Sequence, residues 1–178
     1  LIYVNAMVPG HPCIVGTWPF VSDLRTGAMS GGSGEQGLLT AACAQMLRHF
    51  DLPGGAASGM ADSKMPDAQS GYEKGSTAVL AGLAGLNMVY EAAGMHASLL
   101  GFCLESLIID NDMLGQCMRC VRGIEVNAQT LGIDVMKNVC MGGPGHYLGQ
   151  SQTIDLMQTE YVYPTLGDRS SPKEWEEL

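Results

Sequence analysis

The residues that could carry chemistry gather around three short apolar stretches of the sequence. They are Trp18 and Phe20 at the end of the first stretch (12–18), Asp67 and Gln69 beyond the second (54–60), and Tyr90 and Glu91 in the third (86–94). Aromatic faces attract cations, and carboxylates supply negative charge or accept protons. The chain contains only 2 Trp and 3 Phe, so a loop that holds both Trp18 and Phe20 predicts a ligand-binding wall.

A histidine in a glycine-rich segment is a second candidate. Residues 142–153 read GGPGHYLGQSQT and place His146 among four glycines and a proline. Its imidazole either takes part in chemistry or fastens a C-terminal segment onto the rest of the fold. Glu105 and Asp110 lie five residues apart in an apolar helical pattern, so they point to adjoining faces. A buried carboxylate needs a donor, and His146 and Arg169 are the candidates.

The candidate loops have to be positioned by strands and helices that alternate along the chain. Each apolar stretch leads through a polar, glycine-containing loop into an amphipathic helical pattern, which is typical of βα units. The predicted helices run from Ser33 to about Asp51, from a Ser70–Glu73 capping box, and from about Ser98 to Arg122; further helices are expected at 123–141, 151–161 and after Ser171. In parallel α/β folds, the loops after the strands form the ligand site.

Parallel α/β is therefore the expected fold class. The strands recur every ~35 residues and do not alternate with polar residues, as is typical of strands that are buried on both faces. A doubly wound sheet and a (β/α)8 barrel both fit, but a barrel needs about 250 residues. We interpret 1–123 as the last three βα units and 124–178 as a helical extension. The chain starts without methionine and ends in EWEEL, so we expect a fragment.

Composition limits the kinds of partner. A net charge of −9 disfavours nucleic acid and favours a cationic ligand. No apolar run reaches the ~20 residues of a membrane span and no secretory signal is visible, so we expect a cytoplasmic protein. The six cysteines lie mostly in apolar helical patterns, and the single CMRC motif at 117–120 lacks a second ligand pair. We therefore predict no metal site.

Two other functions are compatible with these patterns. The loop SGGSGEQ (30–36) could bind phosphate at the start of a helix, as in a barrel lyase or isomerase, which predicts an anion near Ser33. A non-catalytic interaction module is the other alternative. Three parallel strands leave two open edges, which favour association, so we expect a homo-oligomer.

Four segments together carry a family resemblance. They read DLRTGAMSGGSGEQ, SKMPDAQSGYEK, ESLIIDNDM and GHYLGQSQTIDLMQTEYVYPTLGDRSSPKEW. The chain resembles the C-terminal part of the trimethylamine methyltransferase family, whose members act on trimethylamine, glycine betaine and related amines. The resemblance implies a (β/α)8 barrel and methyl transfer to the Co(I) corrinoid (cobalamin) of a separate carrier protein. It thus implies two partners, the corrinoid protein and a small methylated amine, with no cofactor held tightly by this chain.

The resemblance also suggests roles for the candidate residues. The trimethylamine branch carries pyrrolysine, whereas this chain has only standard residues, which favours a glycine betaine-type substrate. A quaternary ammonium has no N–H to donate, so aromatic faces and carboxylates must bind it. The expected substrate-binding residues are Trp18, Phe20, Gln69, Tyr90 and Glu91, and the expected catalytic residues are His146, Glu105 and Asp67.

Overall fold

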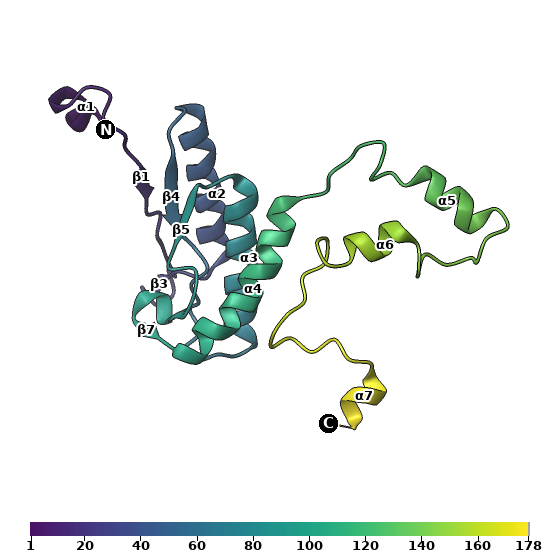
Figure 1. Cartoon of the computed structure of the whole chain (residues 1–178). Helices are drawn as coiled ribbons and strands as arrows, with labels where there is room; N and C mark the ends of the chain where they lie inside the picture. Colours follow the sequence, from purple (N-terminus) through teal and green to yellow (C-terminus); the bar gives the residue numbers. More distant parts are fainter. Residues whose placement is uncertain (178) are drawn as a thin grey trace.

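The computed structural model describes residues 1–177 and is built on a three-stranded parallel sheet (Figure 1). The strands are β1 (Val15–Thr17), β4 (Gly54–Ala57) and β5 (Met88–Tyr90). Each is followed by a helix, α2 (Gly34–His49), α3 (Ala68–Ala84) and α4 (Leu104–Arg122) respectively. The predicted parallel α/β class and the three βα units are confirmed, although each strand is shorter than the apolar stretch that predicted it.

The order of the strands brings three loops to one edge of the sheet. The order is β1-β4-β5, and the central Gly55 pairs with Gly16 on one side and Met88 on the other. Because the strands are parallel, all three carboxyl ends lie at the same edge. The loops that carry the aromatic and acidic candidates therefore start side by side.

Small residues in β4 let the layers approach closely. Every residue of this strand, GGAA, is buried. A Cβ at Gly54 would collide with the Leu47 side chain of α2, so this face receives the helices. On the opposite face, a Cβ at Gly55 would lie 2.8 Å from Cε1 of Tyr90. Helix α3 packs between α2 and α4 and contacts both.

Two of the loops contain small antiparallel hairpins. The β1–α2 loop holds β2 (Val21–Ser22) and β3 (Met29–Ser30). The β5–α4 loop holds β6 (Met95–His96), a tight turn η1 (Ala97–Leu99) and β7 (Gly101–Phe102). This second hairpin was not anticipated: α4 was predicted to begin near Ser98, whereas it begins at Leu104 behind the insertion.

The start of α3 also differs from the prediction. Asp67, not Ser70, is the N-cap, and its carboxylate accepts the Ser70 N–H while the Ser70 hydroxyl accepts the Asp67 N–H. The residue expected at N3 of a Ser70 box, Glu73, lies one turn inside the helix and is 7% exposed. Ser33 caps α2 as predicted, with Oγ accepting from Gln36 N at 3.3 Å.

The terminal helices stand apart from the sheet. In Figure 1, α1 (Ile2–Met7) precedes β1, and α5 (Ile133–Cys140), α6 (Ser151–Leu156) and α7 (Pro172–Glu176) lie beyond α4. The helix predicted over 123–141 is correct only for its second half, because the Asn127 side chain caps a separate turn by accepting the Gln129 and Thr130 N–H groups. None of the helices within residues 1–177 is long and apolar enough to cross a membrane.

Candidate functional site

Three aromatic rings line up at the carboxyl edge of the sheet, and we call Trp18, Phe20 and Tyr90 the aromatic wall. The Trp18 and Tyr90 rings stack with centroids 5.8 Å apart and an interplanar angle of 18°. The Phe20 ring is tilted against Trp18, with centroids 5.5 Å apart. Trp18 is 47% exposed and Phe20 41% exposed, so these rings offer open faces to a ligand.

Glycines in the sheet make this stack possible. Tyr90 lies on β5 and Trp18 directly follows β1, with β4 between them. A Cβ at Gly16 would lie 3.1 Å from the Tyr90 hydroxyl oxygen, so the Tyr90 side chain crosses β4 and reaches β1. The predicted grouping of Trp18, Phe20 and Tyr90 is therefore what the structure contains.

Glu91 directly follows the wall and has an unusual environment. Its φ is 62°, a left-handed conformation that costs a side-chain-bearing residue about 1–3 kcal/mol. Its Oε2 is buried and has no hydrogen-bond partner among the described residues. Strain and an unpaired buried carboxylate oxygen both oppose folding, and such features concentrate where a ligand binds.

A cleft of about 950 Å³ opens between the same three loops. Its lining comes from the β2–β3 hairpin, from the loop that precedes α3 and the first two turns of that helix, and from the β6–β7 insertion. The polar residues that the argument uses are Ser30, Asp62, Gln69, Glu73 and Ser98. Of the predicted substrate-binding residues, Gln69 lines this cleft, whereas Trp18, Phe20, Tyr90 and Glu91 do not.

Asp62 is the centre of the polar network beneath the cleft. Its Oδ1 accepts the N–H groups of Gly31 at 2.7 Å and Gly32 at 3.3 Å. The hydroxyls of Ser30 and Ser98 also donate to its carboxylate. Burial opposes ionisation of Asp62, but these hydrogen bonds outweigh it and hold its pKa below the ordinary value of 3.8.

The same contacts argue against a phosphate site at SGGSGEQ. The N–H groups of Gly31 and Gly32 are those that an anion at this loop would need. The carboxylate of Asp62 already occupies them, and its charge would repel a phosphate. These contacts disfavour an anion at Gly31 and Gly32, and the anion site near Ser33 stays a prediction.

Glu73 and Asp67 hold the β4–α3 loop in place. Glu73 Oε2 accepts the N–H groups of Asp62 at 2.7 Å and Ser63 at 3.3 Å, and its Oε1 accepts from Gln69 Nε2 at 2.8 Å. Asp67 Oδ1 accepts both the Ser70 N–H and the Ser63 hydroxyl, each at 2.8 Å. The Ser70 bond, then the Ser63 bond, lower the Asp67 pKa. Capping thus accounts for Asp67, and its catalytic role stays a prediction.

A buried ion pair lies behind the cleft. Lys74 is 1% exposed and Asp110 is 5% exposed, and Nζ lies 2.6 Å from Oδ2. The same Oδ2 accepts the Gly94 N–H at 2.7 Å. The donor expected for Asp110 was His146 or Arg169; the donors are Lys74 and a backbone amide, because α3 packs directly on α4.

His96 connects this pair to the loops. Its Nδ1 lies 3.2 Å from the carbonyl oxygen of Ser63, which can only accept, so Nδ1 carries the proton. Its Nε2 forms a hydrogen bond with Ser106 Oγ at 2.6 Å and faces Lys74 Nζ at 3.4 Å. The ring is 3% exposed and ties the β6–β7 insertion to both helices.

His146 and Glu105 do not meet in this structure. Glu105 is exposed on the first turn of α4 and accepts from the Cys103 thiol at 3.1 Å, which lowers its pKa. His146 is exposed and belongs to the loop between α5 and α6. Figure 1 shows these two helices on the far side of α4 from the sheet. Because Glu105 is exposed, it does not need His146 or Arg169 as a donor, and the catalytic roles of Glu105 and His146 stay predictions.

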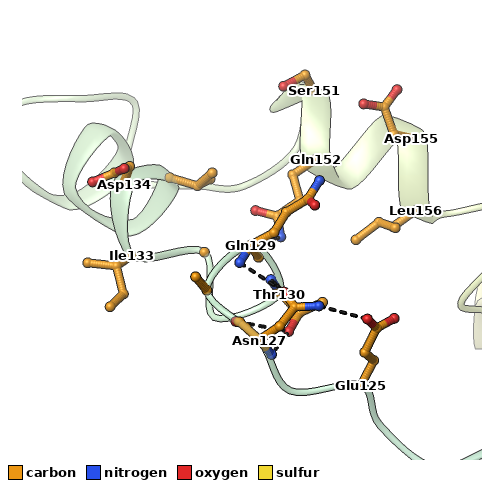
Figure 2. Close-up of a pocket in the computed structure, with 13 residues that line it drawn as sticks. Glu125, Asn127, Gln129, Thr130, Ile133, Asp134, Ser151, Gln152, Asp155 and Leu156 are labelled. Carbon is orange, nitrogen blue, oxygen red and sulfur yellow. Dashed lines mark hydrogen bonds between the residues drawn. The ribbon is translucent and has the colours of Figure 1, made fainter.

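The extension contains a pocket of its own, of about 470 Å³. Figure 2 shows Glu125, Asp134 and Asp155 around it, with the amides of Gln129 and Gln152 between them. Gln152 Nε2 donates to the Gln129 carbonyl oxygen at 3.2 Å and so joins α6 to the turn before α5. Since these carboxylates are exposed to water and lie far from the sheet edge, the pocket adds nothing to the cleft.

Three residues that organise the site were not among the residues predicted to bind substrate or to catalyse. Asp62, Glu73 and Ser98 are defined by long-range contacts that spacing does not reveal. Glu73 gave one signal, because it lies at helical spacing with Ser70, Thr77 and Ala81 on the buried face of α3. A carboxylate in such a stripe needs partners inside the protein.

Comparisons with known proteins place the chain in a family. All of it, residues 1–178, matches the model of the trimethylamine methyltransferase (MTTB) family. It is 35% identical over 167 residues to a glycine betaine methyltransferase of Desulfitobacterium hafniense (strain Y51), covering 94% of this chain and 34% of that protein. It is 33% identical over 175 residues to the trimethylamine methyltransferase MttB of Methanosarcina thermophila, covering 98% and 35%.

A third relative, MttB of Methanosarcina barkeri, is 34% identical over 175 residues, covering 98% of this chain and 34% of that protein. The chain spans about a third of the length of these curated relatives. The match of the family model over every residue decides the assignment. The chain belongs to the trimethylamine methyltransferase family.

Proposed function

We propose that this chain forms part of a methyltransferase that removes a methyl group from a quaternary or tertiary methylamine. The observation that carries the proposal is the aromatic wall, with two of its rings open to solvent and Glu91 directly beyond Tyr90. Each cation–π contact contributes about 0.5–2 kcal/mol to binding. The printed names of the relatives, glycine betaine and trimethylamine methyltransferases, support the same substrate class.

The architecture that suits this role is a (β/α)8 barrel. The helices cover one face of the sheet, and the face that carries Gly16, Gly55 and Tyr90 would line the barrel interior. The three loops at the carboxyl edge would then form a third of the barrel mouth. The remaining strands would pair with the outer edges of β1 and β5, which have no neighbour among the described residues.

For a quaternary substrate the chemistry needs no acid or base group, whereas a tertiary amine would have to carry a proton on nitrogen in order to leave as a neutral secondary amine. The carbon–nitrogen bond breaks with its electron pair staying on nitrogen, so a quaternary substrate leaves as a neutral amine and needs no proton. The methyl acceptor would be the Co(I) corrinoid of a partner protein, and the chemistry it would supply is the electron pair of the new bond. The work of the residues described here is to hold the cation and keep water away from it.

Replacing Trp18 tests the proposal. In the intact protein, Trp18→Leu should weaken binding of glycine betaine or tetramethylammonium, measured by calorimetry, by about 2- to 30-fold, since one ring contributes ~0.5–2 kcal/mol. Trp175→Leu is the matched control, because Trp175 is equally a tryptophan, 64% exposed, and lies in α7 away from the wall. Equal affinity in the wild type and Trp18→Leu would defeat the proposal.

A second measurement separates binding from turnover. Substrate-dependent methylation of Co(I) cobalamin by the intact enzyme should be seen with at least one methylated amine from a panel of betaines and methylamines. No methylation with any member of the panel would remove the enzymatic part of the proposal, whatever the wall binds.

A further inference from the structure

The Asp62 carboxylate joins two loops that also contact each other, where Ser98 Oγ bonds to Gly31 N and to the Met29 carbonyl oxygen. From the β1–α2 loop it receives the Ser30 hydroxyl and the N–H groups of Gly31 and Gly32. From the β5–α4 insertion it receives the Ser98 hydroxyl. Asp62 itself belongs to the third loop, between β4 and α3. One side chain thus connects all three loops at the carboxyl edge of the sheet.

Each of the two loops that bond to Asp62 begins with part of the aromatic wall. The first starts at Trp18 and Phe20 and ends at the residues that bind Asp62. The second starts at Tyr90 and Glu91 and reaches Asp62 through Ser98. Each loop is held at its near end by the sheet and by the Trp18–Tyr90 stack, and at its far end by Asp62 and Ser98, so the arrangement of the wall depends on both anchors.

The conformation at Ser98 shows how firmly this anchor acts. Ala97, Ser98 and Leu99 all have positive φ, at 48°, 53° and 91°. None is glycine, and left-handed conformations of such residues persist only where surrounding contacts enforce them. Besides donating to Asp62, Ser98 Oγ accepts from Gly31 N at 3.1 Å, and Ser98 N donates to Ala61 O at 3.0 Å.

Asp62 is itself fixed to a helix. Its N–H donates to Glu73 Oε2, which lies on the buried face of α3. The carboxylate stays ionised because the donors around it outweigh the effect of burial, which keeps its pKa low. A charged acceptor with four donors from two loops is a stiffer connection than a single neutral hydrogen bond.

We propose that Asp62 is a positioning residue for cation recognition: through Ser30–Gly32 on one side and Ser98 on the other, it sets the spacing between Trp18–Phe20 and Tyr90–Glu91. It does not touch the ligand. This inference rests on the proposed function, since it assigns to Asp62 the geometry of the wall that binds the methylated cation. It predicts that Asp62 governs which size of cation fits as well as how tightly it binds.

The test measures binding of two probe cations to the intact protein by calorimetry at fixed ionic strength. Wild type should bind tetramethylammonium more tightly than tetraethylammonium. Asp62→Ala should weaken tetramethylammonium binding about tenfold and bring the ratio of the two dissociation constants close to one. Asp62→Asn, which keeps one acceptor oxygen for Gly31, should fall between the two. A loss of folded protein alone would scale both affinities equally and leave the ratio unchanged.

Asp23→Asn is the matched control. Asp23 lines the same cleft and carries the same charge, but its carboxylate bonds to Arg25 within its own hairpin. A general electrostatic effect acts on both monovalent cations alike, so removing this charge should leave the ratio of the two affinities unchanged. Hydrogen exchange should quicken at 29–32 and 97–100 in Asp62→Ala and stay unchanged along α2.

The outcomes separate the two proposals. If the wild type binds tetramethylammonium and Asp62→Ala keeps both the affinity and the ratio, the positioning role is wrong and the proposed function stands. If the wild type does not bind it, both are wrong. Should Asp62→Ala fail to fold, Ser98→Ala, which removes a single donor, must still lower the ratio; an unchanged ratio there overturns the inference.

Discussion

At the scale of single residues, the site contains side chains that destabilise the fold and make no compensating contact among the described residues. Glu91 is strained and leaves a buried oxygen without a partner. Trp18 and Phe20 expose large apolar surfaces to water. Proteins keep such residues where binding a ligand satisfies the charge and covers the rings. Replacing any of these residues should therefore reduce ligand binding more than it reduces the stability of the fold.

Glu91→Gly tests this opposition. Glycine adopts φ of 62° without a steric penalty, and the unpaired oxygen disappears. The free energy of unfolding should therefore stay level or increase by up to ~1 kcal/mol, and the thermal midpoint should not fall. Affinity for a quaternary ammonium should fall at the same time, because the carboxylate is gone. Glu91→Gln is the control that keeps size and strain but removes the charge. Stability and affinity that fall together in Glu91→Gly would contradict this reasoning.

At the scale of elements, the helices are held by polar groups as well as by apolar packing. The buried stripe of α3 contains Glu73, Lys74 and Thr77 beside Ala78 and Ala81. Glu73 binds the preceding loop, and Lys74 binds α4 through Asp110. The polar residues thus fix how α3 sits against α4 and against the loops of the cleft.

Lys74→Met should therefore be strongly destabilising. It leaves the Asp110 charge buried without its cation, which typically costs about 3–5 kcal/mol. Asp110→Asn on the Lys74→Met background should recover part of the loss, because an amide oxygen still accepts the Gly94 N–H and carries no charge. A double-mutant cycle from denaturant unfolding measures the coupling. Two single-mutant costs that simply add would show that the pair is not coupled.

The sequence predicts the elements better than the contacts between them. Three βα units follow from apolar periodicity and from caps such as Ser33, which are local signals. The wall was also predictable, because parallel strands must bring Trp18 and Tyr90 to one edge. Asp62 was not, since its role depends on Ser98, which lies 36 residues away. The β6–β7 hairpin was missed because its turn uses three left-handed residues that are not glycine.

At the scale of the whole molecule, the extension is joined to the α/β part mainly through α4. Asp112 accepts the N–H groups of Leu166 at 2.6 Å, Thr165 at 3.1 Å and Gly167 at 3.2 Å. Arg119 pairs with Glu160 at 2.9 Å. Of the described strands, β1 and β5 each keep one open edge, at which another chain could pair. The homo-oligomer stays a prediction, and so does the boundary at 123/124.

The Asp112 contact should respond to acid. The Leu166 N–H, followed by that of Thr165, lowers the Asp112 pKa below its ordinary value of 3.8. A lowered folded-state pKa means that the contact stabilises the docked extension fully above pH 3.8 and is lost as pH falls through the lower folded value. The Leu166 amide resonance in the labelled protein should therefore shift only below pH 3.8.

Two variants complete this measurement. In Asp112→Asn the Leu166 resonance should be displaced already at neutral pH and should not titrate. In Asp168→Asn it should match the wild type, because the carboxylate of Asp168 bonds to Ser170 within its own turn. A wild-type resonance that stays fixed through the acid range would mean that Asp112 does not hold the extension.

Gly55 in β4 has a consequence for how sequences of this kind can diverge. A methyl group there would meet the Tyr90 ring at 2.8 Å and the Met88 carbonyl oxygen at 2.6 Å. A chain that gains a side chain at this position must give up the reach of the tyrosine across the strand, and with it one surface of the proposed cation site. Among relatives, an aromatic residue at position 90 should thus be inherited together with glycine at 55.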